Sequence, residues 1–343
     1  MKRRHANTKR WRRCGGTRNM GYSLAMELLN KGHRVTVLNR GMTRDDLPEQ
    51  IMRLRADRTD IHQMRRALKA RKFDVVADFV MFNGQSATQI IDLLRGNTDH
   101  YIFISTGQVY LVREDIERPF REDDYAGRIQ PQPKENTFAY EEWRYGHDKR
   151  AAEDALRTAW QQDGFPFTSL RLPMVNSRRD HYDRLYNYVL RLQDGNPILA
   201  PQTPRFPLRH VYAQDVVQAI LRLIDGKVGI GESYNISQDE TVTLDEFLSI
   251  AADAIGKTAE IVYRKRSELE ANGFLPDCSP FSERWMSELA NKRSKRDLGM
   301  QYTPLTEYLP ELVRYFVNAD LQKPPGYKRR PAELNFLRQP EWN

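Results

Sequence analysis

The sequence has little cysteine and lacks long apolar runs, and each scarcity excludes a class of protein. Cys14 and Cys278 are the only cysteines in 343 residues, too few for a disulfide framework or a cysteine-rich metal site. No run approaches the ~18 apolar residues of a membrane span, and no apolar stretch follows the basic start as it would in a signal peptide. We therefore expect a cytoplasmic protein with no metal site and no membrane partner.

Acidic residues are absent from one part of the chain, its first 26 residues. This segment contains eight Lys or Arg and no Asp or Glu, whereas the rest of the chain carries 46 basic and 46 acidic residues. The net charge of +8 therefore belongs to the N-terminus. Because the body of the protein has no overall basic bias, nucleic acid is not indicated as a partner, although a local patch is not excluded.

Residues 1–13, which read M-K-R-R-H-A-N-T-K-R-W-R-R, also lack the apolar character of a buried strand. They permit three interpretations: an arm that binds polyanions, a solvated tail without function, or the product of a wrong start site or upstream frameshift. We favour the third interpretation, because the segment that follows requires an apolar strand before it.

A glycine-rich turn, G-G-T-R-N-M-G, stands at residues 15–21 and organises the chain. A helical pattern at 22–31 and an apolar strand pattern at 35–38 follow it. Turn, helix and strand in this order are typical of a dinucleotide-binding unit, in which backbone N–H groups hold a pyrophosphate. The candidate cofactor-binding residues in the turn are Gly15, Gly16, Thr17, Arg18, Met20 and Gly21.

The end of the second strand of such a unit selects the cofactor. An acidic residue there binds the 2′-hydroxyl of NAD, whereas an arginine accommodates the 2′-phosphate of NADP. This chain has Arg40 at that position and a second arginine, Arg18, inside the turn. We therefore expect NADP in preference to NAD.

Strand and helix patterns alternate along the next part of the chain. Residues 51–72 have a helical pattern interrupted at 56–60, after which Asp60 can cap a helix. Strands are predicted at 73–80, 101–104 and 167–172, and helices at 85–94 and 140–162, with a long polar loop at 111–138. This alternation predicts an α/β fold with a Rossmann-type, doubly wound parallel sheet.

The same patterns suggest how the chain is divided. After the basic segment 1–13, residues 14–175 form an NAD(P)-binding domain, to which 205–236 return. Residues 176–204 and 237–317 form a smaller C-terminal α/β lobe for the substrate. The tail, 318–343, contains four prolines, and we expect it to be extended or disordered.

Tyr145 and Lys149 carry the chemistry that the sequence suggests. They are four residues apart on a predicted helix and therefore share one face. A nearby cation lowers a tyrosine pKa, so that the phenol can act as acid or base. Ser105 and Thr106 follow a strand at the sheet edge where ligands bind. Alone, Tyr-x-x-x-Lys also describes a solvated helix face, but the ordered set is more specific.

With these motifs the sequence resembles the extended short-chain dehydrogenase/reductase superfamily, in its NAD-dependent epimerase/dehydratase branch. The resemblance covers about residues 14–317. It rests on G-G-T-R-N-M-G, V-T-V-L-N-R-G, A-D-R-T-D, Y-I-F-I-S-T-G-Q-V-Y, Y-G-H-D-K, R-H-V-Y-A-Q-D-V-V and S-Y-N-I-S-Q-D-E-T-V-T-L-D-E-F. It implies an NAD(P)-dependent epimerase, dehydratase or reductase that acts on a sugar nucleotide or related polyol and forms a homodimer.

The resemblance also implies a role for each matching residue. Thr106 would bind a substrate oxygen, Tyr145 would be the catalytic acid and base, and Lys149 would hold the nicotinamide ribose. The remaining candidates are Asp57, which would contact adenine, and the weaker pocket residues Ser105, Arg209 and His210.

Two further hypotheses remain beside the enzyme. Atypical members with a G-G-T-R turn include RNA-binding proteins and proteins that only sense the cofactor. The missing first strand would also impair cofactor binding, and it leaves open a non-functional product of a damaged gene.

Overall fold

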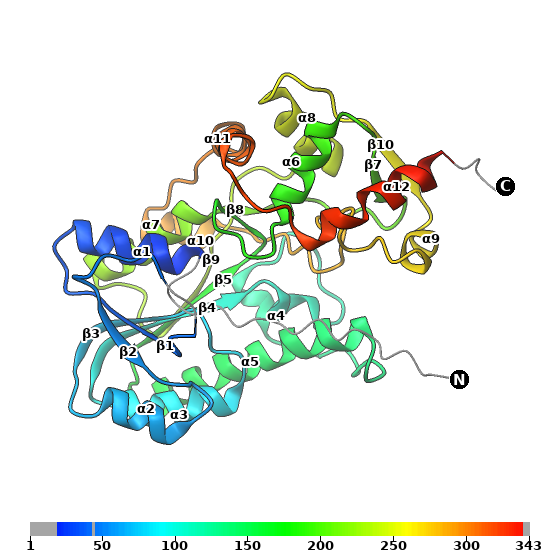
Figure 1. Cartoon of the computed structure of the whole chain (residues 1–343). Helices are drawn as coiled ribbons and strands as arrows, with labels where there is room; N and C mark the ends of the chain where they lie inside the picture. Colours follow the sequence, from blue (N-terminus) through cyan, green and yellow to red (C-terminus); the bar gives the residue numbers. More distant parts are fainter. Residues whose placement is uncertain (1–18, 43–44, 339–343) are drawn as a thin grey trace, which may run out of the picture.

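The structure, a computed structural model, describes residues 19–42 and 45–338. It contains a domain built on parallel strands and a second lobe packed beside it (Figure 1). The expectations for residues 1–13 and for Gly15, Gly16, Thr17 and Arg18 lie outside the described residues.

Parallel strands form the centre of the first domain. Four of them pair in the order β3 (Phe73–Asp78), β4 (Thr98–Thr106), β5 (Phe167–Leu172) and β9 (Glu232–Asn235). A separate parallel pair consists of β1 (Thr36–Asn39) and β2 (Met52–Arg55). The α/β class and the Rossmann-type parallel sheet are thus confirmed.

The sheet is interrupted between β1 and β3. In the strand order of this fold, the first strand lies between the second and the fourth, which is between β1 and β3 here. Among residues 19–42 and 45–338, no strand occupies this position. Val75, Val76 and Ala77 of β3 are accordingly only half-buried, whereas β5 is buried along its whole length. The sheet lacks its central strand in the part of the chain that the structure describes.

Helices cover both faces of this domain (Figure 1). One face carries α1 (Asn19–Asn30), α7 (Ala213–Gly226) and α10 (Lys292–Leu298); the other carries α2 (Ile61–Leu68), α3 (Gly84–Leu94) and α5 (Phe138–Asp163). Because strand side chains alternate, Ile102 and Ile104 of β4 pack towards α7, while Tyr101 and Phe103 pack towards α3 and α5. The long loop 111–138 follows α4 (Gln108–Leu111) and contains the 3-10 turn η1 (Glu122–Tyr125).

The second lobe has its own apolar core. Side chains from α6 (Arg184–Asp194), α8 (Leu244–Asp253) and α11 (Leu305–Asn318) form most of it. The parallel pair of β7 (Ile198–Pro201) and β10 (Ile261–Arg264) accompanies them, and α9 (Arg266–Ala271) follows β10. A second parallel pair, β6 (Val175–Asn176) with β8 (Val211–Tyr212), packs Val175 and Val211 into the core of the first domain. Within the described ranges, no helix is long and apolar enough to span a bilayer.

The helical prediction is wrong for residues 52–55, because these residues form β2. Among the described strands, β2 pairs only with β1 and is half-exposed. Its sequence therefore lacks the continuous apolar run that identifies a buried strand. The prediction for Asp60 is confirmed. Its carboxylate accepts hydrogen bonds from the backbone N–H groups of His62 and Gln63 at the start of α2.

The proline-containing tail is folded, contrary to the expectation of an extended or disordered segment. It forms the 3-10 turn η2 (Pro325–Arg329) and the helix α12 (Arg330–Leu337). Pro331 lies in the first turn of α12, where proline costs no hydrogen bond.

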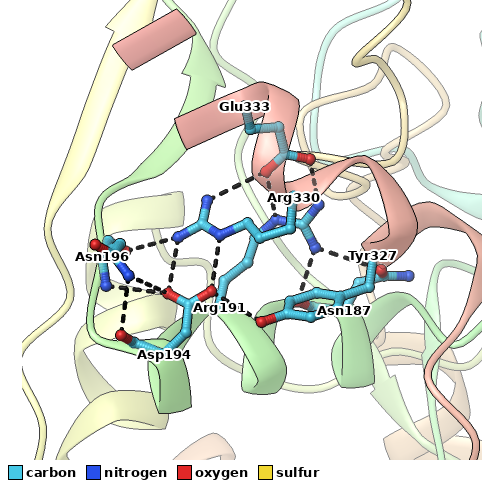
Figure 2. A network of polar contacts seen from close by, with 7 residues as sticks. All are labelled: Asn187, Arg191, Asp194, Asn196, Tyr327, Arg330 and Glu333. Atoms are coloured by element: carbon cyan, nitrogen blue, oxygen red, sulfur yellow. Dashed lines mark hydrogen bonds and ion pairs between the residues drawn. The ribbon is translucent and has the colours of Figure 1, made fainter. Parts of the chain in front are cut away.

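Buried ion pairs hold α12 against α6 (Figure 2). The Glu333 carboxylate receives Arg191 Nη2 at 2.5 Å and Arg330 Nη1 at 3.1 Å, and all three side chains are almost fully buried. Arg330 Nε also donates to Asp194 at 2.8 Å. The composition of the tail does not reveal this network, because its partners are more than 130 residues away in sequence.

We expect Glu333→Gln to lower the free energy of unfolding by on the order of 3 kcal/mol, since it leaves two buried guanidinium groups without their shared counter-charge. Urea denaturation at neutral pH measures the change. The matched control is Glu260→Gln at an exposed position, which should alter stability by less than about 0.5 kcal/mol. Equal stabilities for the two variants would show that the network does not hold the tail.

Candidate active site

Helix α5 carries Tyr145 and Lys149 and begins at a defined cap. The Thr137 side chain accepts a hydrogen bond from the Tyr140 N–H, which fixes the first turn. Gly146 lets α4 approach closely, since a Cβ there would lie 2.6 Å from the Gln108 carbonyl oxygen. The residue after the candidate acid–base tyrosine is thus held against the segment that follows β4.

Thr106, at the carboxyl end of β4, lies close enough to the Tyr145 phenol for its hydroxyl to favour the ionised form of that phenol. The Phe82 ring lies beside them, with its centroid 6.4 Å from that of Tyr145. The pKa of Tyr145 is raised above its ordinary value, mainly because protein atoms displace water around the phenol, although the residue as a whole is 37 % exposed and Thr106 acts the other way. The expected lowering of the tyrosine pKa by a neighbouring ammonium is therefore not what this geometry produces.

Lys149 is buried and turned towards the main chain. Its ammonium donates to the carbonyl oxygens of Met81 at 2.9 Å and Ile104 at 2.7 Å. It also lies 4.4 Å from the Phe103 ring centroid and 5.4 Å from that of Phe82. Burial lowers the pKa of Lys149 to about 7. Two of its three N–H groups are thus engaged, and its charge is sensitive to pH near neutrality.

Ser105 serves packing, in contrast to the expectation of a pocket residue. Its hydroxyl donates to the Glu153 carboxylate at 2.5 Å, and both groups are buried. Arg171, paired with Ser105 across β4 and β5, donates to the same carboxylate at 2.6 Å. Burial alone would raise the pKa of Glu153, but Arg171 and Ser105 lower it. These three side chains tie α5 to the sheet one helical turn after Lys149.

The second lobe covers the site. A Cβ on Gly107, next to Thr106, would overlap Ser287 of the lobe, so only glycine permits this approach. On α5, one turn before Tyr145, Glu142 accepts a hydrogen bond from Gln108 Nε2 at 2.6 Å. Burial raises the pKa of Glu142 to about 7.

Sequence reasoning missed Phe82, Glu142 and Tyr182, whose phenol acts electrostatically on that of Tyr145. A signal existed only for Phe82, which follows the carboxyl end of β3 and so lies at the edge where ligands bind.

Two of the cofactor candidates, Arg40 and Asp57, follow the carboxyl ends of β1 and β2. Arg40 Nη1 is 4.0 Å from the Asp57 carboxylate, and both side chains are partly exposed. Met20 and Gly21 belong to the first turn of α1, where Gly21 is buried. The described residues therefore offer a cation and a carboxylate where the adenosine end of a dinucleotide would lie in this fold.

A buried ionic cluster next to this edge was also not expected. Asp78, the last residue of β3, accepts hydrogen bonds from Arg58 at 2.7 Å and from the Tyr101 hydroxyl at 2.5 Å. Burial alone would raise the pKa of Asp78, but Arg58 and Tyr101 lower it. Its negative charge also favours the protonated form of Lys149.

Arg209 and His210 are engaged inside the lobe, so the prediction that they line the pocket finds no support. Arg209 donates to the carbonyl oxygen of Gln238 at 2.9 Å. His210 is buried between the rings of Phe247 and Phe281, and its Nδ1 is 3.1 Å from the Asn176 amide. Burial lowers the pKa of His210 to about 3, so this ring is neutral.

The ordered motifs and this geometry agree with one protein family. The family model for the NAD-dependent epimerase/dehydratase family matches residues 14–237 of the chain. The chain belongs to this family. The expectation of an NAD-dependent enzyme of the epimerase/dehydratase type is confirmed at the level of the family.

Solved structures share the fold. UDP-glucose 4-epimerase of Thermotoga maritima is 20 % identical with a TM-score of 0.69, and the match covers 88 % of this chain and 97 % of that one. The dTDP-glucose 4,6-dehydratase of Bacillus anthracis is 14 % identical with a TM-score of 0.69, and the match covers 89 % and 96 %.

A curated relative differs in its described role. The chloroplast stem-loop binding protein of 41 kDa b of Arabidopsis thaliana is 27 % identical over 272 residues, which are 75 % of this chain. The match spans 66 % of the length of that relative.

We expect the free energy of unfolding to rise from pH 7 to pH 10 more steeply in the wild type than in Lys149→Met. An unfolded lysine titrates near 10.4, whereas the pKa of buried Lys149 is about 7. Between these values the unfolded state binds more protons, so raising the pH stabilises the native state. Urea denaturation at several pH values measures the difference, which should reach a few kcal/mol.

Lys257→Met, at an exposed lysine, is the control and should give a profile parallel to that of the wild type. A Lys149→Met profile that is also parallel to the wild type would refute the assigned shift.

Proposed function

We propose that the protein is an NAD(P)-dependent epimerase, dehydratase or reductase of a sugar nucleotide or related polyol. Thr106, Tyr145 and Lys149 are its working residues. The observation that carries the proposal is the approach of Thr106, at the carboxyl end of β4, to the Tyr145 phenol, with Lys149 one turn along the same helix. Neighbouring structures support the substrate class, since one is described in complex with UDP-glucose and another as a dTDP-glucose dehydratase.

In the proposed reaction, the nicotinamide supplies hydride transfer to or from a substrate carbon. Tyr145 takes the proton from the substrate hydroxyl at that carbon and returns it when the carbonyl is reduced. Thr106 hydrogen-bonds the same oxygen and keeps it within reach of the phenol. The resulting keto stage is what allows inversion or loss of a neighbouring group.

Lys149 would hold the nicotinamide ribose with its remaining N–H, since its other two N–H groups bind the carbonyl oxygens of Met81 and Ile104. Its pKa of about 7 implies that its positive charge declines as the pH rises through neutrality. Asp78 and Glu153 oppose that loss, because their charges favour the protonated amine. The two buried carboxylates thus act on the site without touching the substrate.

NADP is the cofactor that we favour within this NAD-dependent family. Arg40 follows β1 directly, and residues 39–42 contain no acidic side chain that would bind the ribose 2′-hydroxyl. Because Arg40 is half-exposed and its only described carboxylate partner, Asp57, is 4.0 Å away, its guanidinium can turn towards a 2′-phosphate. A homodimer and a cytoplasmic location stay predictions.

A nucleic-acid-binding role is the second candidate. It is favoured by the name of the Arabidopsis relative, which describes a stem-loop binding protein, and by the basic segment 1–13. This role need not exclude the first, because phosphate contacts require only an exposed basic surface.

We expect Tyr145→Phe to reduce turnover of a UDP- or dTDP-hexose by at least about 100-fold, since it removes the group that moves the proton. NADPH affinity, measured by fluorescence titration, should stay within about twofold. Tyr140→Phe, nearer the start of the same helix, is the control and should keep full activity. Undiminished turnover in Tyr145→Phe would exclude the assigned role.

Arg40→Asp should weaken NADPH binding by about tenfold or more, because the carboxylate repels a 2′-phosphate. The difference between the affinities for NADPH and NADH should therefore become smaller. Arg34→Asp makes the same charge change at the opposite end of β1 and should leave both titrations unaltered. If NADPH binds Arg40→Asp as tightly as the wild type, Arg40 does not select the cofactor.

A further inference from the structure

An arginine-lined groove of about 360 Å³ runs between β2 and α2 at the outer edge of the sheet domain. None of the side chains that line it is acidic or aromatic. The lining residues are Arg53, Leu54, Arg55, Gln63, Arg66, Ala67 and Arg71.

Regular secondary structure decides which side chains meet at the groove. Arg53 and Arg55 are two residues apart on β2 and share the face of Val37, on the α1 side, whereas Leu54 shares with Leu38 the face that α2 covers. Gln63, Arg66 and Ala67 lie three and four residues apart on α2 and share one face of the helix. The groove thus lies between the outer edge of β2, where Leu54 faces α2, and the Arg66 face of α2. The Arg53 guanidinium is turned to the other face of the strand, where it binds Asp45.

The backbone of β2 adds to this surface. Met52 and Ala56 donate their N–H groups to the carbonyl oxygens of Val35 and Asn39, on the β1 side. In a parallel strand the residues between them, Arg53 and Arg55, direct their N–H groups the other way. The outer edge of β2 therefore presents further hydrogen-bond donors next to the groove.

The charge of this surface is largely uncompensated. Residues 51–72 contain eight Lys or Arg and two Asp. Arg53 is neutralised by Asp45, with Nη2 at 2.6 Å from the carboxylate, and Arg58 is neutralised by the buried Asp78. Arg71 donates to the Ala67 carbonyl oxygen, and Arg55 to the Asn39 side chain, so neither bond neutralises a charge. The balanced total charge of the chain body conceals this local excess.

We propose that the groove between β2 and α2 binds the phosphate backbone of a nucleic acid. Guanidinium groups bind phosphate oxygens with two parallel hydrogen bonds, and several of them in a row fit consecutive phosphates better than one small anion. Exposed Arg65, Lys69 and Lys72 on the same segment extend the basic surface beyond the groove. Without aromatic rings to stack on bases, the site reads the backbone and is indifferent to sequence.

This site is separate from the candidate active site. Its lining includes neither Arg40 nor Asp57, and it does not involve Tyr145 or Lys149. The inference therefore stands or falls independently of the proposed oxidoreductase.

The test is a fluorescence anisotropy titration of the full chain with a short labelled stem-loop RNA at several salt concentrations between about 50 and 200 mM. We expect Arg66→Gln/Arg71→Gln to bind severalfold more weakly and to reduce the slope of log affinity against log salt by about two, one unit for each lost phosphate contact. Arg66→Lys/Arg71→Lys keeps both charges and should retain most of the slope.

The matched control is Arg222→Gln/Arg314→Gln, which removes the same charge from exposed positions on α7 and α11. It should keep the wild-type slope. NADPH titrations of all variants should be unchanged, and circular dichroism verifies that each is folded.

Three outcomes would overturn the proposal. A groove variant that binds RNA like the wild type would place the contacts elsewhere, for example on residues 1–13. An equal loss in the control would indicate a non-local charge effect. Equally tight binding of inorganic tripolyphosphate, with displacement of the RNA, would identify a small-anion site.

Discussion

The candidate site depends on the hydrogen bonds and the ion pair that the buried Glu153 carboxylate makes with the sheet. This carboxylate joins the Ser105 hydroxyl at the end of β4 to the Arg171 guanidinium on β5, and it projects from α5 one turn after Lys149. Loss of one partner of such a pair leaves an uncompensated buried charge, which costs several kcal/mol. The register between α5 and the sheet is therefore fixed. That register brings the Tyr145 hydroxyl, two helical turns away, to Thr106.

The interrupted sheet sets a second constraint. A phosphate-binding turn is positioned by the strand that leads into it and by the helix that follows. Here α1 is in place and packs through Leu24 against the sheet, but the position between β1 and β3 holds no strand among residues 19–42 and 45–338. The affinity for the pyrophosphate therefore depends strongly on the residues that precede Gly15. By contrast, Thr106 lies on β4, which pairs with a strand on each side, and Tyr145 lies on α5, which Glu153 ties to the sheet.

The second lobe is held by buried charge as well as by its apolar core. Glu333 binds both Arg191 of α6 and Arg330 of α12, so the C-terminal helix is part of this lobe (Figure 2). The same lobe contacts Gly107 through Ser287. The outer edge of the first domain is different. On β2 and α2, Arg55, Arg66 and Arg71 lack acidic partners among the described residues, so their charge is available to a polyanion. One chain thus uses arginine for internal ion pairs and for an exposed groove.

The sequence by itself determined the class of fold, the positions of β3, β4 and β5 along the chain, and the candidates Thr106, Tyr145 and Lys149. These follow from local patterns: apolar runs, a helical spacing of four, and side chains placed after a strand. Tertiary structure alone decided that Ser105 and His210 are buried packing residues, that residues 52–55 form an edge strand, and that the proline-rich tail folds into a helix. Each of these outcomes depends on a partner far away in sequence, such as Glu153 for Ser105 or Arg191 for Glu333. Local composition cannot predict such partners, because burial and ion pairing arise only when the chain folds.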